Sequence, residues 1–491
     1  MLSAKLIIHK TTKTLGEIPH QVNAQRKLIR FKLSSRLFYI LFITCSIQLS
    51  TRNFLIAQDN SPYSRYGLGD LHPNSNILNR GMAGISAAYS DQLSVNFSNP
   101  ASYSGFYSLQ QAKSKKTEYG RILLDVGLNY DSRTLRETNN PQKYKVTNTY
   151  FSYLQMGIPV KKNIGIVFGL RPISKINYKV GRSERLYDPF SGLPIDSAFT
   201  EFAGDGGAFL FNTGTGIAIK NFSLGVNAGY LFGKKDYSTR RYFINDTVAY
   251  AGSNHQTKAS FGGLFFNLGM QYRVDLNKDK TKYFQIGIFG NTKNKLNSRN
   301  DIIRETYTKG SDGGNLRIDS VSEQLDIKGK VTYPPTFGGG FLVEKQPDVK
   351  NGGWLFGIDF IQNSWDNYRF NGQIDSVKNN WELKAGVQIK PSLKEARYKN
   401  FISYRAGIFF GKDYVYLNRK LPEFGVTAGL SLPIANLKDA QRRFRTQYSI
   451  VNISAEYIKR GNKENLLREN FFRLSVGFAL SDLWFTKRRY D

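Results

Sequence analysis

The sequence predicts an all-β protein, namely a 14-stranded antiparallel transmembrane β-barrel. Three observations lead to this fold class. The chain has 491 residues with 45 glycines, 29 tyrosines and 35 phenylalanines, a composition unlike that of a helical or α/β enzyme. Apolar residues recur at every second position from Ile122 onward. An N-terminal stretch of basic and then apolar residues has the form of an export signal.

Residues 1–58 are predicted to be a signal peptide or leader. Five basic residues lie between positions 26 and 36, and the apolar stretch Leu37 to Leu49 follows them. A basic segment before about a dozen apolar residues is typical of a secretory signal, and it is too short to cross a bilayer as a stable helix. Cleavage is expected near Ala57-Gln58. A lipoprotein signal at Cys45 is the alternative, which the large residues before Cys45 disfavour.

The composition argues against several kinds of site. The single cysteine lies in the leader, so the mature chain has no disulfide and no cysteine nucleophile. Of the four histidines, only His72 and His255 lie beyond the leader, which disfavours a protein-built metal centre. No phosphate-binding loop and no GxSxG element is present. We expect no cofactor, no metal and no enzymatic activity, with a hydrolase built on His72 or His255 as the enzymatic alternative.

The formal net charge of +31 indicates anionic neighbours. Nucleic acid is disfavoured, because the positive charge is spread through short polar turns and is not massed on one helix or interleaved with aromatic residues on one sheet. We expect outer-membrane lipid, lipopolysaccharide or an acidic protein as partners instead.

A period of two in the sequence predicts the strands. From Phe222 to Phe232, apolar residues alternate with Ser223, Gly225, Asn227 and Gly229, which gives one apolar face and one small or polar face. Segments of this kind are predicted to start near residues 122, 149, 164, 207, 222, 259, 283, 336, 353, 381, 402, 423, 448 and 471. An even number of segments of about ten residues is the signature of an outer-membrane barrel. Residues 119–491 are therefore assigned to the barrel.

The connections between the predicted strands alternate in length. Long connections are expected at 131–148, 172–206, 234–258, 291–335 and 360–380, and short ones at 161–163, 220–221, 275–282 and 345–352. In outer-membrane barrels the short turns face the periplasm and the long loops face outward. Both termini are therefore expected in the periplasm of a bacterial outer-membrane protein. Basic turns on that side, such as Lys161-Lys162, suit an acidic periplasmic partner.

A soluble β-sandwich or propeller is the alternative fold, since its strands also alternate. It is disfavoured because the second face of the strands is largely Gly, Ser and Asn, and because Tyr and Phe cluster at strand ends as in the aromatic girdles of barrels. The tryptophans flank predicted strands, and anchoring at the membrane interface is expected to explain them: Trp354, Trp365, Trp381 and Trp484.

Residues 59–118 precede the first strand and contain two short motifs. Arg80-Gly81-Met82-Ala83-Gly84 is followed by Asn99-Pro100-Ala101. These motifs resemble the N-terminal hatch of the FadL-type long-chain fatty acid transporters of the outer membrane. The opening SPYSRYGLGD and the ending SDLWFTKRRYD look like a Bacteroidota branch of that superfamily. The alternative is that Asn99-Pro100 simply starts a turn.

The resemblance implies passive uptake of a hydrophobic or amphipathic small molecule by a monomeric barrel whose lumen is filled by the hatch. The residues of the hatch motif are then Arg80, Gly81, Gly84, Asn99, Pro100 and Ala101. Gly81 and Gly84 would lower the steric cost of a movement of the hatch. The alternative explanation for these glycines is close packing of the hatch against the barrel wall. The other class of function is a protein-binding barrel subunit of an outer-membrane secretion or assembly machine, similar to the shuttles of type IX secretion. The connection 291–335 would suit such docking.

Polar residues are expected to point into the barrel at the positions opposite the apolar ones: Asp125, Asn129, Asn227, Asn267, Asp359, Glu382, Lys384, Arg405, Glu456 and Arg473. Such residues can pair across the lumen and anchor the hatch, or bind a ligand head group. Arg405 and Arg473 are the candidates for holding a carboxylate, because a guanidinium presents a planar fork to it. A continuous apolar lining would favour a ligand, and a filled lumen would favour a protein partner.

Overall fold

In the computed structural model, contacts between residues divide the chain into two compact units, Met1–Ala57 and Gln58–Asp491. The described residues all belong to the second unit: 61–110, 117–138, 140–244, 250–310, 314–392, 398–434 and 447–484. The predicted leader, 1–58, lies outside them. Within the described part of the chain, no helix is long and apolar enough to cross a membrane.

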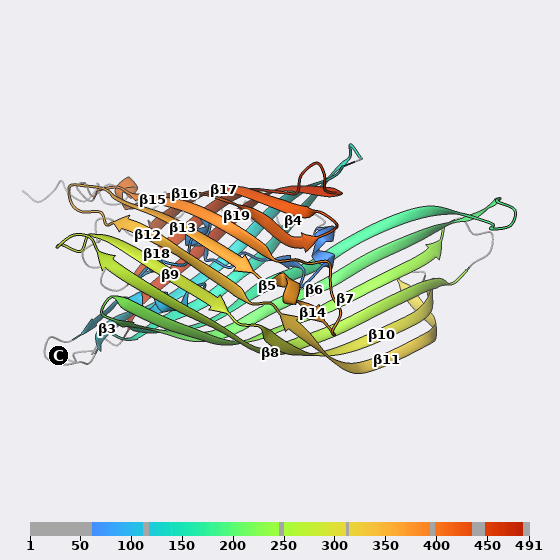
Figure 1. Cartoon of the computed structure of the whole chain (residues 1–491), viewed down its shortest axis with the longest axis horizontal. Coiled ribbons are helices and arrows are strands. Elements are labelled where there is room, and N and C mark those ends of the chain that lie inside the picture. The colour runs from blue at the N-terminus through green and yellow to red at the C-terminus, as the bar shows by residue number, and fades with distance from the viewer. Residues whose placement is uncertain are drawn as a thin grey trace, which may run out of the picture. The chain divides into compact units, whose positions relative to one another are not determined.

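The second unit is a closed antiparallel barrel of 14 strands (Figure 1). The uninterrupted strands of its wall are β3 (Thr117–Glu137), β4 (Lys143–Lys161), β5 (Ile164–Tyr187), β6 (Pro194–Ile219), β7 (Phe222–Phe243), β8 (Gly252–Asp275), β13 (Gly353–Asn363), β15 (Asn380–Lys390), β16 (Ser403–Tyr416), β17 (Lys420–Ile434), β18 (Gln447–Arg460) and β19 (Leu467–Trp484). The other two strands each consist of two pieces. β9 (Lys282–Asn291) continues into β10 (Asn294–Lys309), and β11 (Asn315–Tyr333) continues into β12 (Thr336–Lys345).

Each wall strand pairs with its neighbours along the chain, and β19 pairs with β3 to close the barrel. The predicted all-β barrel and its strands are confirmed, since a wall strand contains or begins within one residue of every predicted position. We call the end with the turns 162–163, 220–221 and 346–352 the turn end, and the end with the connections 188–193, 417–419 and 461–466 the loop end.

Four of the five predicted long connections are wrong over most of their length, whereas most of 360–380 is indeed a connection, at 364–379. β5 runs to Tyr187 and β6 begins at Pro194, so that little of 172–206 is a loop. Likewise, most of 234–258 belongs to β7 and β8, and most of 291–335 to β10 and β11. These segments carry polar residues on both faces, because both faces contact water. The apolar alternation on which the prediction rested is therefore missing from them.

An apolar band surrounds the outside of the barrel. On β7 the outward side chains from Phe222 to Phe232 are apolar and largely exposed, and Lys234, Asp236 and Arg240 take their place farther along the strand. A strand segment of that length, tilted by about 40°, spans roughly 25–30 Å, which is the height of the apolar band of a membrane barrel. The band therefore marks the part of the wall that crosses a membrane.

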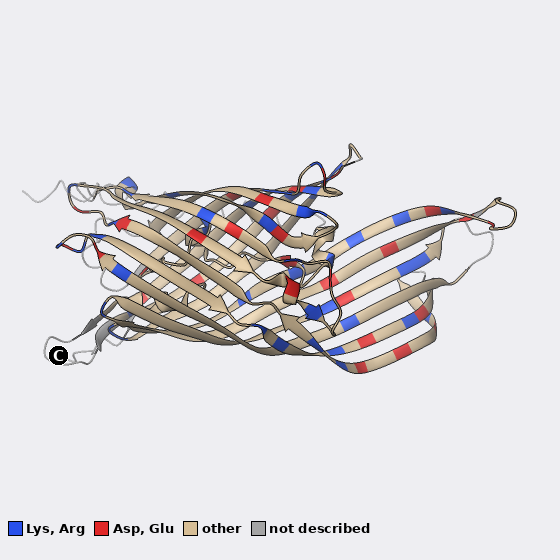
Figure 2. Cartoon of the chain, in the orientation of Figure 1, with Lys and Arg blue, Asp and Glu red and all other residues tan. Residues whose placement is uncertain are grey.

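Six strands continue past the apolar band as a separate sheet (Figure 1). We call it the protruding sheet, and it consists of residues 176–187, 194–205, 234–243, 252–260, 294–309 and 315–330. Among the described strands, its two outermost strands have a partner on one side only: β5 beyond Lys175 pairs with β6, and β11 before Lys330 pairs with β10. Figure 2 shows charged residues along the whole length of this sheet, whereas the barrel strands are mostly uncharged.

Residues 61–107 run through the lumen, and we call them the inner segment. Its elements, from the loop end to the turn end, are η1 (Pro62–Arg65), β1 (Asp70–Leu71), α2 (Ile77–Arg80) and η2 (Pro100–Gly105), after which β2 (Ser108–Gln110) leads into β3. Met82 and Ile85 pack on Leu342 and Leu355 of the wall, so the core of this unit lies inside the barrel. The predicted limits of the hatch, 59–118, extend into residues outside the described ones and stay a prediction.

The first and last described residues lie at opposite ends of the barrel. Ser61 donates a hydrogen bond to Glu469 near the loop end, whereas Trp484 pairs with Gly120 at the turn end. The termini themselves lie outside the described residues, so the expectation that both face the periplasm stays a prediction.

Short elements close the loop end. η3 (Trp365–Asn367) and β14 (Arg369–Phe370) lie in the connection between β13 and β15. At the turn end, η4 (Tyr398–Phe401) precedes β16. The ring of Trp365 stacks on Tyr414 at 4.2 Å and is only 2% exposed. Interface anchoring is therefore wrong for Trp365, which is a core residue. Trp354, in contrast, is 40% exposed on the outside of β13.

Candidate functional site: the filled lumen

The Asn99-Pro100-Ala101 motif lies against the wall at the turn end. Asn99 begins η2, where its Oδ1 accepts a hydrogen bond of 3.1 Å from the backbone N–H of Ala101. Its Nδ2 donates to the carbonyls of Ala87 at 2.6 Å, and of Met270 on β8 and Ile288 on β9 at 3.3 Å each. This asparagine therefore starts a turn and also joins the inner segment to two strands of the wall.

Glycines in the wall make room for the inner segment. A Cβ atom on Gly225 of β7 would lie 2.2 Å from the carbonyl carbon of Pro100, and one on Gly287 of β9 would lie 1.8 Å from the carbonyl oxygen of Ala87. Gly216 and Gly269 on the neighbouring strands are equally crowded, with nearest atoms at 2.6 and 2.0 Å. Real Cβ atoms do not approach other atoms so closely. The small inward residues that the strand pattern showed are thus contact points for the inner segment.

Gly81 and Gly84 lie where the inner segment touches β16 and β17. A Cβ atom on Gly81 would be 2.9 Å from the Cα atom of Gly429, and the φ angle of Gly84 is +80°, which few L-residues adopt. Between them, the N–H of Ala83 donates to Oγ1 of Thr427 at 2.9 Å. These contacts are those of close packing, and movement of the segment stays a prediction.

Arg80 is buried at the centre of the lumen, with 1% of its surface exposed. Its guanidinium donates to Asn129 of β3 at 2.6 Å, Ser152 of β4 at 2.6 Å and Ser475 of β19 at 3.3 Å. Its Nε donates to the carbonyl of Ser75 at 3.1 Å. Hydrogen bonds thus compensate for the burial of this charge, and they tie α2 to both sides of the seam between β3 and β19.

Inward carboxylates hold the backbone of the inner segment. Asp359 of β13 accepts hydrogen bonds from the N–H groups of Ser86 at 2.6 Å and Ala87 at 2.8 Å. Asp125 of β3 accepts from the N–H of Val95 at 3.3 Å. Such bonds replace the water that these backbone groups would otherwise bind. The polar face of the wall therefore serves largely as a scaffold for the segment inside it.

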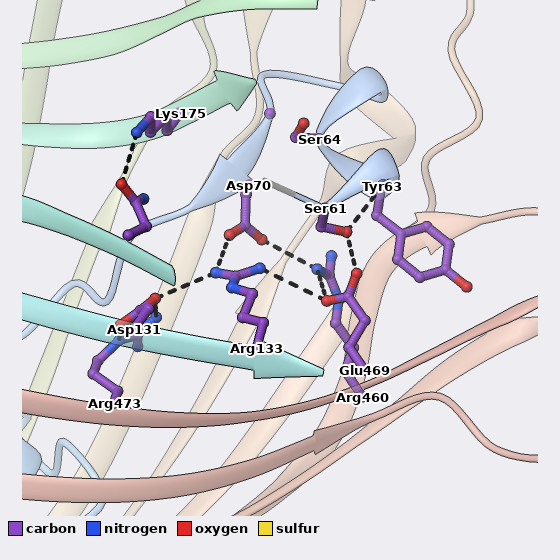
Figure 3. A network of polar contacts seen from close by, with 12 residues as sticks. Ser61, Tyr63, Ser64, Asp70, Asp131, Arg133, Lys175, Arg460, Glu469 and Arg473 are labelled. Carbon is purple, nitrogen blue, oxygen red and sulfur yellow. Dashed lines mark hydrogen bonds and ion pairs between the residues drawn. The ribbon is translucent and has the colours of Figure 1, made fainter. Parts of the chain in front are cut away.

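A network of buried ion pairs joins the start of the inner segment to the wall at the loop end (Figure 3). Asp70 pairs with Arg133 of β3 and, at 3.1 Å, with Arg460 of β18. Arg460 also pairs with Glu469 of β19 at 3.3 Å and with Asp413 of β16 at 2.8 Å. Burial by itself would raise the pKa of Asp70, but Arg133 and Arg460 outweigh it and hold that pKa well below its usual range.

The two arginines predicted to hold a head group already have partners in the wall. Arg473 donates to both carboxylate oxygens of Asp131, at 2.8 and 3.0 Å, and pairs with Glu456 at 3.4 Å. Arg405 donates to Gln388 at 2.7 Å and to Ser431. Both point inward, as the alternation indicated. Binding of a carboxylate ligand by either residue stays a prediction.

A cavity of about 220 Å³ remains on the loop side of the inner segment. Charged side chains of both signs line it: Asp70, Arg80, Arg133, Arg171, Glu382, Lys384, Asp413, Glu423, Glu456, Arg460 and Arg473. Phe265, Phe289, Phe409 and Phe471 also contribute to the lining. The apolar part is thus interrupted by ionic groups on several strands, and the lining is not continuously apolar.

Within the described residues, no group of three His, Cys, Asp or Glu side chains is placed to hold a metal ion. The ring of His72 lies 4.4 Å from that of Tyr150 inside the barrel. His255 lies on β8 of the protruding sheet, and its predicted place in a loop is therefore wrong.

The network around Asp70 was missed by sequence reasoning. Arg460 and Glu469 lie at the loop ends of their strands, where the alternation of apolar residues is already weak. The pairing of β18 with β19 places Arg460 opposite Glu469. The pairing of β19 with β3 places Phe471 opposite Arg133. A signal was available in the register of the last two strands, but no pattern within the inner segment pointed to Asp70.

A family model described as BamG matches residues 38–491 of this chain. No curated protein sequence matches it. Similar solved structures include a Pseudomonas aeruginosa FadL homologue, with 13% identity, a TM-score of 0.48 and coverage of 85% of this chain and 100% of that chain. The Ralstonia pickettii toluene transporter TbuX has 12% identity and a TM-score of 0.46, with 84% of this chain and 99% of that chain covered. The monoaromatic hydrocarbon channel CymD has 12% identity and a TM-score of 0.46, with 85% of this chain and 98% of that chain covered. Likenesses this distant carry no inference about what this chain binds.

Proposed function

For this chain, which belongs to the BamG family, we propose a role as a protein-binding barrel subunit of an outer-membrane secretion or assembly machine. One observation carries the proposal. The lumen is occupied from the loop end to the turn end by the inner segment, whereas six strands extend past the membrane band as an ordered sheet whose two side edges have no partner among the described strands. A barrel that conducts solutes needs an open path. This barrel instead presents a surface suited to another polypeptide.

The free edge of β11 supports protein binding. Residues 315–329 contain no proline, and their backbone groups on the side away from β10 have no strand partner within the described residues. Leu316, Ile318, Val321 and Leu325 along this strand are 57–71% exposed. Charged side chains such as Arg317 and Glu323 lie between them, and the pairing with β10 shifts its register at three places. The unpaired backbone groups of an edge strand are a template for a further strand. Addition of a partner strand is an established mode of peptide recognition.

The apolar band and the lysines beyond it support a position in the outer membrane. We place the turn end in the periplasm and the protruding sheet outside the cell, since short turns of outer-membrane barrels face the periplasm. Four exposed lysines follow the band on the outer face of the sheet: Lys258, Lys295, Lys328 and Lys330. Within the described residues none of them forms an ion pair. They are suited to contact the phosphates of lipopolysaccharide and other outer-membrane lipid.

The proposal is tested by native mass spectrometry of the tagged chain, extracted from its own outer membrane in mild detergent. We expect a single copy of the barrel with a protein partner at fixed stoichiometry. The double substitution Val321→Arg and Leu325→Arg should remove that partner, whereas Tyr144→Arg, at an exposed position of β4 outside the protruding sheet, should not. A lone barrel that retains only a lipid-like molecule would overturn the proposal.

Passive uptake of a hydrophobic or amphipathic small molecule is the second candidate function. The cavity on the loop side of the inner segment favours it, because Arg473 lines this cavity together with Phe409 and Phe471. Binding of a fluorescent fatty acid to the purified barrel tests this function. We expect Arg473→Gln to weaken such binding by about tenfold if the carboxylate lies at that residue. Arg405→Gln is the matched control, since Arg405 does not line the cavity.

A further inference from the structure

An open cleft of about 850 Å³ lies on the inner face of the protruding sheet, outside the filled lumen. Its floor is formed by β5, β6, β7, β8 and β10. The opposite wall is formed by η1 of the inner segment and by residues 370–375, which follow β14. The cleft therefore joins the two regions on which the proposed function rests, the inner segment and the protruding sheet.

The cleft has an apolar, largely aromatic surface. The rings of Tyr178 and Tyr237 lie 6.3 Å apart on its floor. Val180 and Phe202 are each 40% exposed, and Ile374 on the opposite wall is 77% exposed. Side chains of this kind bury well against an apolar or aromatic partner, with about 25 cal/mol gained for each Å² removed from water.

Two arginines and a lysine line the cleft against one carboxylate, and burial lowers the pKa of that lysine, Lys235, to about 7. The guanidinium of Arg65 lies over the ring of Tyr237 at 4.3 Å. Nζ of Lys235 donates to the carbonyl of Gly67 and, at 2.8 Å, to the hydroxyl of Tyr368. Arg304 donates to two backbone carbonyls, at 3.0 and 3.4 Å. Within the described residues none of the three forms an ion pair, and Asp375 accepts a hydrogen bond of 2.8 Å from the N–H of Gly67.

The outer face of the same sheet carries both paired and unpaired cations. Lys234 pairs with Asp205 at 2.8 Å, and Glu201 pairs with both Lys179 at 2.8 Å and Arg240 at 3.5 Å. Arg317 at the edge pairs with Glu305 at 3.4 Å and with Glu323 at 2.8 Å. The cleft differs from this face because its arginines, which form no ion pair within the described residues, lie beside an apolar floor in a concave surface.

We propose that this cleft binds an acidic segment of a partner protein, in extended conformation, with carboxylates for the cations and apolar or aromatic side chains for the floor. The inference rests on the proposed function and names the chemistry of the partner. Tyr178 and Val180 belong to the part of β5 that pairs with β6 only, so the cleft is continuous with a free strand edge. A chain lying there can add its backbone to β5 while its side chains enter the cleft.

The first experiment measures fluorescence anisotropy of a labelled peptide of alternating Glu and Tyr with the folded barrel in detergent micelles. We expect saturable binding that weakens with salt, and at least tenfold weaker binding of a peptide with Gln in place of Glu. Arg65→Gln with Arg304→Gln should also weaken binding by about tenfold. Lys258→Gln with Lys295→Gln removes the same charge from the outer face and should leave the affinity unchanged. Equal affinities for the two peptides, or equal losses in the two double variants, would overturn the inference.

The second experiment separates the failure of this inference from that of the proposed function. A photo-reactive amino acid is placed in cells at Phe202 in the cleft, at Phe199 on the outer face as a control, and at Val321 on the edge of β11. We expect cross-links from Phe202 to one partner, at a peptide that mass spectrometry shows to be acidic. Cross-links from Val321 alone would overturn the cleft assignment and keep the protein-binding function. No protein cross-link at any of the three positions would overturn both.

Discussion

The membrane wall and the protruding sheet are built from the same strands, yet their side chains follow different rules. Within the apolar band, β7 turns apolar side chains outward and places Gly225 and Asn227 against the inner segment. Beyond Phe232, both faces of β7 carry polar side chains, and ion pairs such as Lys234 with Asp205 link it to its neighbour. The comparison teaches that the alternation of apolar residues marks where a strand contacts lipid, and not where a strand begins or ends.

The largest expected effect on this comparison comes from Asp70→Asn, which removes a buried charge from the lumen. Arg133 and Arg460 each lose a partner but keep Glu469, so we expect a loss of about 3 kcal/mol, at the low end for a broken buried pair. Hydrogen–deuterium exchange across residues 61–80 should become roughly a hundredfold faster at neutral pH. Asp205→Asn in the protruding sheet is the matched control. Equal effects of the two substitutions would contradict the difference between the regions.

The same carboxylate predicts how the start of the inner segment responds to acid. Because the folded-state pKa of Asp70 is held below the usual value of about 4, its stabilising effect is present above that value and is lost as the pH falls through the folded-state pKa. The difference in exchange between the native chain and Asp70→Asn, corrected for intrinsic rates, should be constant from neutral pH to about pH 5. It should shrink below about pH 3. A difference that disappears between pH 7 and pH 5 would point to another group.

A smaller effect is expected from Gly225→Ala, which tests the close packing of the wall against the inner segment. The added methyl group meets the backbone of Pro100, and overpacking of this kind typically costs about 1–3 kcal/mol. A folded barrel migrates differently on a denaturing gel from the same chain after heating. The temperature at which this difference disappears should fall. Gly339→Ala is the control, because its Cβ would lie 3.4 Å from the nearest atom, an ordinary contact. If both variants melt like the native chain, the lumen is less tightly packed than the contacts indicate.

The smallest effect is expected in the protruding sheet. Lys234 and Asp205 are both more than half exposed, so their coupling in a double-mutant cycle with alanine should be below about 1 kcal/mol and should decrease with salt. Chemical denaturation of the native chain, the two single variants and the double variant provides the measurement. A coupling several times larger would show that the sheet resembles the lumen in its electrostatics.

The sequence was sufficient to predict the 14 strands, because lipid on one side and the inner segment on the other force a period of two. It also indicated correctly that Arg405 and Arg473 face inward. The long strands of the protruding sheet could not be predicted in this way, since water contacts both of their faces. The partners of Asp70 could not be predicted either, because Arg460 lies 390 residues away and is brought close only by the register of the closed barrel.

The ion pairs at the seam between β3 and β19 constrain the order in which this protein can mature. Arg473 belongs to the last strand and Asp131 to the first, and Arg133, Glu469 and Asp70 are joined in the same network. These contacts require the final strand to have been synthesised and the ring to have closed. The inner segment is made first, but its ion pairs at this end can form only when the ring has closed.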